Sequence, residues 1–124
     1  MNHVKMLDKV IDLLKKARAL VVAGWTQKVS ARDSNGLQVT ARNPTATCFC
    51  MIGALDASDR DNDEEGKIYS EAYTYLTFEV GKTGVKSIPA YNDAPGRKQE
   101  EVVERFDNAI LAAEEDRKKH GGRE

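Results

Sequence analysis

Two groups of polar and aromatic side chains lie outside the helical stretches of the sequence and could bind a ligand. The first group comprises Trp25, Gln27, Arg32 and Asp33. The second group comprises Tyr91, Asn92, Asp93 and Arg97. Loops carry binding residues more often than helices do, and Trp, Tyr and Arg concentrate binding energy at interfaces. A structural role is the alternative, because such residues also cap turns, form ion pairs or fill the core.

The two arginines indicate the class of ligand. A guanidinium group pairs with a carboxylate or phosphate through two parallel hydrogen bonds. We expect the two loops to converge near the N-terminus of a central helix. Arg32 and Arg97 would pair with an anionic ligand, and Trp25 and Tyr91 would stack on it. The resulting prediction is a non-enzymatic binding module for a small anionic ligand, such as a nucleotide-like metabolite, or for a peptide or protein partner.

A cysteine-dependent hydrolase or transferase is the alternative function. Its nucleophile would be Cys48 or Cys50. Gln27 would donate a hydrogen bond to the oxyanion, and Asn92 or Asp93 would orient the catalytic groups. Thiol hydrolases use a histidine to take the proton, and the sequence has no histidine near these residues. The reactivity of either cysteine stays open. A self-associating structural protein, with a homodimer built on the last helix and the small side of the central helix, is a third possibility.

Several other chemistries fit the sequence poorly. The two histidines, His3 and His120, lie near the ends, so a zinc site would require a terminal segment to fold back onto the core. Residues 81–83 lack the earlier glycine of a phosphate-binding loop. The acidic stretch 61–66 resembles a calcium loop, but its twelfth position is Ala72 instead of a bidentate Glu. We expect no metal and no cofactor.

The composition is that of one ordinary globular domain of 124 residues. Nineteen basic and twenty acidic residues give a formal net charge of −1, which argues against binding to nucleic acid through phosphate neutralisation. No apolar run approaches the roughly 20 residues that span a bilayer, and the first residues lack the pattern of a signal peptide. We therefore expect a cytoplasmic protein that has no membrane partner.

Helical periodicity predicts three amphipathic helices, over residues 4–23, 67–80 and 98–119. Gly24 is the natural stop for the first. The least polar stretch, residues 43–57, predicts a buried central helix capped by Asn43, with small residues along one side that would allow another backbone to approach. A strand over residues 45–52 is the competing prediction for this stretch.

Between the first and central helices, Asn35-Gly36 is the strongest hairpin signal, flanked by residues 27–31 and 37–41. Residues 88–96 are predicted to be irregular because they contain two prolines. The expected fold is mainly α, α+β at the margin: a small single domain of about four helices with one short β-hairpin. We expect residues 1–119 to form this domain and residues 120–124 to form a frayed tail.

Four short motifs carry a family resemblance: Gly24-Trp25-Thr26-Gln27, Ala31-Arg32-Asp33, Cys50-x-x-Gly53-Ala54-Leu55 and Asn92-Asp93-Ala94-Pro95-Gly96-Arg97. In this order and spacing they resemble an uncharacterised family of short bacterial and phage proteins, a domain of unknown function, over most of the chain. Members of that family tend to carry Trp at the position of Tyr91, and a Ser or Thr helix cap at that of Lys98. The resemblance implies no activity. For a viral member it is compatible with sequestering a host signal or blocking a host complex, hence with a phage- or host-defence-related role.

Overall fold

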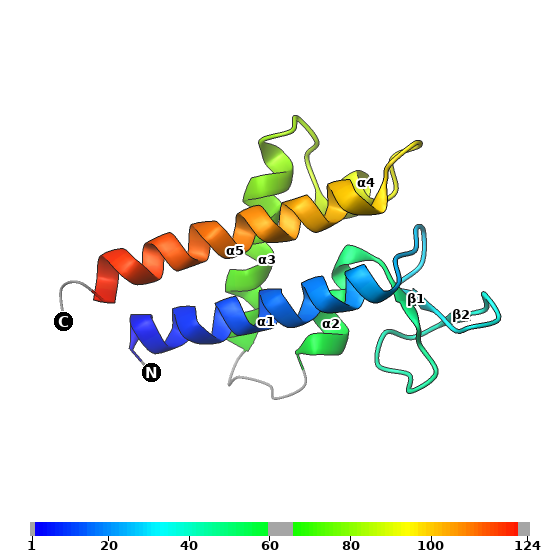
Figure 1. Ribbon diagram of the computed structural model, residues 1–124, viewed down its shortest axis with the longest axis horizontal. Coiled ribbons are helices and arrows are strands. Elements are labelled where there is room, and N and C mark those ends of the chain that lie inside the picture. The colour runs from blue at the N-terminus through cyan, green and yellow to red at the C-terminus, as the bar shows by residue number, and fades with distance from the viewer. Residues whose placement is uncertain (1, 60–65, 122–124) are drawn as a thin grey trace.

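Two long antiparallel helices run side by side along the molecule in the computed structural model, which describes residues 2–59 and 66–121 (Figure 1). Helix α1 spans His3–Ala23 and helix α5 spans Gln99–Gly121. The two helices pack against each other through apolar faces, and side chains such as Leu14 and Phe106 are fully buried. Apolar residues that recur at helical spacing produce these faces, so both predicted helices are confirmed.

Helix α3, Lys67–Gly81, crosses the two long helices and contacts both of them (Figure 1). Ile68, Leu76 and Val80 are buried on its inner face, which confirms the helix predicted from residues 67–80. Residues 61–65 of the calcium-like acidic stretch 61–66 lie outside the described residues.

The central helix begins later than predicted. Helix α2 spans Met51–Ser58, with Cys50 as its N-cap. The prediction that Asn43 starts this helix was wrong, because the Asn43 carboxamide oxygen instead accepts a hydrogen bond from Thr45 N–H at 2.9 Å within a turn. The following residues enter the sheet and pair with another strand there, so the competing strand prediction accounts for part of the segment.

The sheet has three short antiparallel strands in the order β2-β1-β3: β1 is Ala31–Arg32, β2 is Gln38–Val39 and β3 is Cys48–Phe49. Asp33 and Gly36 close the hairpin between β1 and β2, and Gly36 has a φ of +81°, which glycine adopts without strain. The predicted hairpin is confirmed with shorter strands, and β3 adds an edge that the sequence analysis assigned to a helix.

A short helix replaces the predicted irregular segment. Helix α4 spans Ile88–Asn92 and is capped by the Ser87 hydroxyl, which accepts a hydrogen bond from Ala90 N–H at 3.2 Å. Pro89 lies in the first turn, where a helix does not need the N–H that proline lacks. The proline was therefore compatible with a helix, and the prediction for residues 88–92 was wrong.

The fold is a small, mainly helical domain with a minor β component, as predicted. Within residues 2–59 and 66–121 it has five helices and one three-stranded sheet. The described part of the chain contains no helix that is both long and apolar enough to cross a membrane.

Two glycines are needed because another backbone passes close to them. A Cβ on Gly53 would lie 2.0 Å from the carbonyl oxygen of Ser30, and one on Gly24 would lie 2.3 Å from that of Thr47. Gly24 is extended, with a φ of −171°, so its role is close approach and not the left-handed stop that often ends a helix. The close approach at Gly53 confirms that the small side of the central helix accepts another backbone.

We predict that Gly53→Ala lowers the free energy of unfolding by about 2 kcal/mol or more, because the added methyl group forces α2 away from the loop before β1. Urea denaturation followed by circular dichroism measures the loss. Gly81→Ala is the matched control, since a Cβ at this helical glycine meets nothing within 4 Å. Equal midpoints for the two variants would contradict the packing argument.

Candidate functional site

The carboxamide of Asn92 joins the two groups of polar residues. Its Oδ1 accepts hydrogen bonds from Trp25 Nε1 at 2.8 Å and from Met51 N–H at 3.1 Å. Its Nδ2 donates to the carbonyl oxygen of Thr26 at 3.1 Å and to Asp93 Oδ1 at 2.9 Å. Asn92 is only 2% exposed, and these four bonds use both lone pairs and both N–H groups of its side chain.

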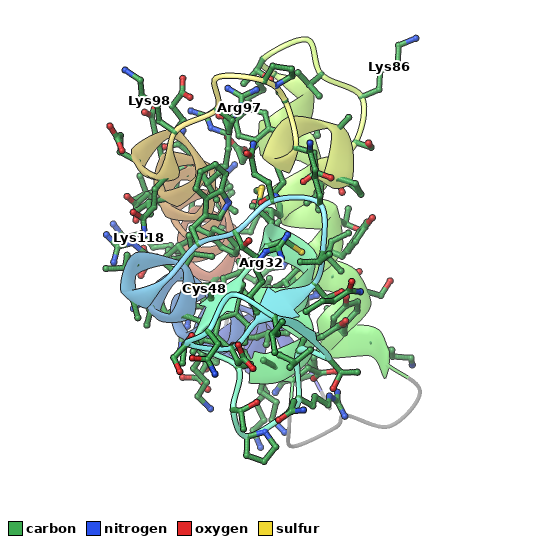
Figure 2. All side chains as sticks on the ribbon, turned by 90° about the vertical axis from the view of Figure 1, so that its right-hand side faces the viewer. Arg32, Cys48, Lys86, Arg97, Lys98 and Lys118 are labelled. Atoms are coloured by element: carbon green, nitrogen blue, oxygen red, sulfur yellow. The ribbon has the colours of Figure 1, made fainter. Side chains whose placement is uncertain are left out.

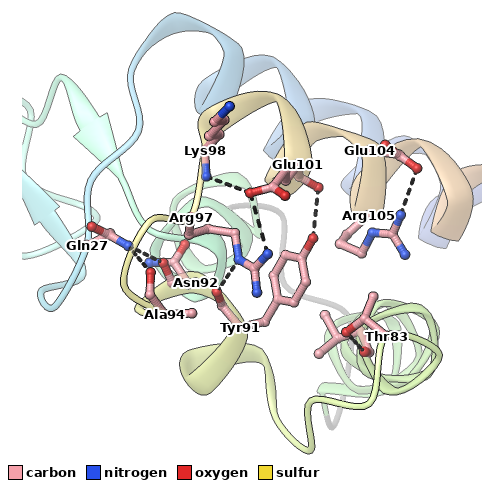
Figure 3. Close-up of polar contacts among 11 residues, drawn as sticks. Gln27, Thr83, Tyr91, Asn92, Ala94, Arg97, Lys98, Glu101, Glu104 and Arg105 are labelled. Atoms are coloured by element: carbon pink, nitrogen blue, oxygen red, sulfur yellow. Dashed lines mark hydrogen bonds and ion pairs between the residues drawn. The ribbon is translucent and has the colours of Figure 1, made fainter.

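Further bonds tie the same two loops together. Gln27 Nε2 donates to the backbone oxygens of Asn92, at 2.9 Å, and Ala94, at 3.1 Å (Figure 3). The backbone N–H of Lys28 donates to Asp93 Oδ1 at 2.8 Å. The loops therefore lie side by side at the N-terminus of α2, which confirms their predicted convergence, while their role in ligand binding stays a prediction.

Tyr91 and Arg97 support each other within this junction. The Arg97 guanidinium lies 3.6 Å from the centroid of the Tyr91 ring, and Arg97 Nε donates to the Tyr91 carbonyl oxygen at 2.8 Å (Figure 3). The Tyr91 hydroxyl donates to the carbonyl oxygen of Glu101 at 3.3 Å. Tyr91 is 3% exposed. Its ring therefore packs against Arg97 and offers little surface on which a ligand could stack.

Glu101 replaces the helix cap that the sequence lacks. Its carboxylate accepts a hydrogen bond from Lys98 N–H at 2.8 Å, at the start of α5. This hydrogen bond, together with the nearby Arg97 guanidinium, lowers the pKa of Glu101. The helix thus begins at Gln99 although Lys98 cannot act as a Ser or Thr cap.

Arg32 and Asp33 lie at the hairpin. Arg32 Nε donates to the Thr26 hydroxyl at 2.9 Å. Thr26 in turn accepts a hydrogen bond from Asn92, so Arg32 is linked to Asn92 through Thr26. Asp33 Oδ1 accepts the N–H groups of Asn35, at 2.9 Å, and Leu37, at 3.0 Å, and so stabilises the turn. Figure 2 views this end of the molecule and labels Arg32.

A cavity of about 310 Å³ opens beside Asn92. It is lined by Lys28, Val29, Ser30, Gln38, Cys50, Ile52, Ile88, Pro89, Asn92 and Asp93. A more open hollow of about 990 Å³ adjoins it between the hairpin and α2, and the two share Ser30 and Gln38. Asn92 and Asp93 are the predicted site residues that line the cavity, and the other six hold the loops that form its walls.

The sequence analysis missed Lys28. Among the described residues it is the one non-glycine with a positive φ, +73°. Such a conformation costs on the order of 1 kcal/mol, which the hydrogen bond from its N–H to Asp93 helps to offset. The Lys28 ammonium forms no hydrogen bond or ion pair within residues 2–59 and 66–121. No sequence signal marks a lysine for this conformation.

Cys50 caps α2, since its Sγ accepts a hydrogen bond from Gly53 N–H at 3.2 Å. Burial raises the pKa of the Cys50 thiol and the nearby Asp93 and Asp56 carboxylates add to this, while the Gly53 N–H opposes it in part. The thiol is therefore protonated at neutral pH, which is unfavourable for a nucleophile.

Both histidines lie far from Cys50. His3 and His120 contact each other, with ring centroids 4.3 Å apart, where α1 begins and α5 ends, at the opposite end of the molecule from the sheet (Figure 1). In the part of the chain that the structure describes, no three His, Cys, Asp or Glu side chains are placed to hold a metal ion.

Comparison with known proteins places this fold in a family. Residues 6–112 match the model of DUF6197, a family of unknown function, and this range includes all eight candidate residues. The chain belongs to the DUF6197 family. No curated protein and no solved structure matches it. Membership of DUF6197 confirms the resemblance to an uncharacterised family, and any function must be inferred from the site.

For this DUF6197 domain we predict that Asn92→Ala lowers the free energy of unfolding by about 3 kcal/mol, because it leaves the buried partners of the carboxamide without hydrogen bonds. Trp25 fluorescence should report the same change, through a shift in emission as the indole loses its acceptor. Urea denaturation of Asn108→Ala is the control, since the Asn108 side chain forms no hydrogen bond within the described residues. Similar losses in the two variants would rule out the special role of Asn92.

We also predict that Cys50 reacts slowly with iodoacetamide. In a Cys48→Ser background at pH 7, alkylation of the folded protein should be at least about tenfold slower than in urea, because partial burial raises the pKa of the Cys50 thiol and keeps it protonated. The rate should rise at a higher pH in the folded protein than in the unfolded chain. Mass spectrometry of timed samples gives both rates, and rapid alkylation of the folded protein would restore the enzyme alternative.

Proposed function

We propose that the protein is a non-enzymatic binding module that holds a small anionic ligand in the cavity beside Asn92. The observation that carries this proposal is that Lys28 lines the cavity and that its ammonium has no partner within the described residues. Cys50 and Ile52, at the N-terminus of α2, line the same cavity, and this end of the helix adds a partial positive charge. A carboxylate or phosphate would complete the pairing of Lys28.

The size and lining of the cavity agree with a small polar ligand. Its volume of about 310 Å³ is at the lower end for small-molecule sites, which span about 300 to 1,000 Å³. Ile52 and Ile88 supply apolar wall, while Ser30 and Gln38 offer hydrogen-bonding groups. The adjoining open hollow, which shares Ser30 and Gln38, would accommodate a polar extension of the ligand.

This proposal assigns new roles to the residues first identified. Trp25, Gln27 and Arg97 position the two loops through hydrogen bonds, and Asp93 holds the backbone of Lys28. Contact with the ligand falls to Lys28 and its neighbours on the cavity wall. Such a module acts by sequestering its ligand, which requires enclosure and charge but no catalytic base.

We predict that an anion binds and that Lys28→Ala weakens binding by about tenfold or more. The probes are inorganic phosphate, citrate and adenosine monophosphate, each titrated by calorimetry. Lys86→Ala is the matched control, because Lys86 is likewise exposed and without a partner among the described residues, but lies outside the cavity (Figure 2). The proposal fails if none of the three probes binds, or if the Lys28 and Lys86 variants bind equally well.

A further inference from the structure

A second cavity, of about 330 Å³, lies between α3 and α5 and shares no lining residue with the cavity beside Asn92. Tyr75 and Phe78 contribute from α3, and Ala112 contributes from α5. Four acidic residues also line it: Glu71, Glu79, Glu115 and Asp116. The hollow therefore combines apolar surface with negative charge.

Phe78 supplies the apolar part of this surface. It is 67% exposed, the most exposed of the large hydrophobic side chains in the described residues. Lys82 Nζ lies 5.3 Å from the centroid of its ring, and also pairs with the buried carboxylate of Glu79 at 3.0 Å. Lys82, the one cationic residue in the lining, is therefore already paired with the Glu79 carboxylate.

The acidic groups are largely available to a partner. The Glu71 and Glu115 carboxylates form no hydrogen bond or ion pair with any described residue. Asp116 accepts a hydrogen bond from the Tyr75 hydroxyl. Burial raises the pKa of Tyr75. The hydrogen bond to Asp116 and the negative charges of Asp116 and Glu71 raise it further, as expected beside a negatively charged patch.

We propose that the hollow between α3 and α5 docks a basic amphipathic segment of a partner protein. One apolar side chain of the segment packs against Phe78 and Ala112, and cationic side chains around it pair with Glu71, Glu115 and Asp116. Charge complementarity selects this occupant over a second copy of the chain. Two copies meeting through this face across a twofold axis would bring like charges together.

The first experiment uses two fluorescein-labelled synthetic peptides of 14 residues, one of Leu and Lys and one of Leu and Glu in the same amphipathic pattern. Fluorescence anisotropy should show binding of the Leu/Lys peptide and none of the Leu/Glu peptide. Nuclear magnetic resonance shifts of the ¹⁵N-labelled protein should change at residues 71–82 and 112–116. Equal binding of both peptides, no binding of either, or shifts confined to other surfaces would overturn the proposal.

The second experiment tests the residues of the hollow. Phe78→Ser and Glu115→Lys should each weaken binding of the Leu/Lys peptide by about tenfold or more. Leu111→Ser is the matched control, since Leu111 is 57% exposed on α5 but does not line the hollow. Circular dichroism checks that each variant keeps the wild-type helix content. An equal loss in Leu111→Ser would overturn the proposal, as would concentration-dependent shifts at this face without peptide, which indicate a second copy.

Discussion

The four hydrogen bonds of the buried Asn92 carboxamide hold this end of the molecule together. Taking a carboxamide out of water is unfavourable unless each polar atom finds a partner, and here every one does. One of the bonds also sets the start of α2. The first N–H group of a helix has no partner within the helix, and that of Met51 bonds to Asn92. A side chain from a distant segment thus decides where the central helix begins.

The same junction explains how the cavity keeps its shape. Lys28 adopts a conformation that lysine seldom takes, and the Asp93 carboxylate that holds its backbone is itself bonded to Asn92. Gln27 adds bonds to the backbone on either side of Asp93. These bonds fix the backbone of Lys28, so binding of an anion would not include the entropy cost of ordering the loop.

The sequence predicts a structural element well when the residues that determine the element lie within it or next to it. The apolar stripes of α1 and α5 and the Asn35-Gly36 turn are local patterns, and all three were correctly predicted. The true start of α2 depends on Asn92, which no pattern around Met51 reveals. We expected the two loops to meet, but the sequence did not indicate which side chains would face the cavity. Tyr91 and Arg97 are residue types that often occur in binding sites, yet here the Arg97 guanidinium packs on the Tyr91 ring.

The long sequence separation of the junction has a kinetic consequence. Trp25 and Asn92 are 67 positions apart, whereas α1 and α5 can each begin to form from neighbouring residues. Contacts that close long loops are entropically costly, so they slow folding and tend to form late. The cavity should then assemble only after the individual helices have begun to form. Loss of these contacts would separate the walls of the cavity, so the shape of the cavity depends on segments that are distant in the sequence.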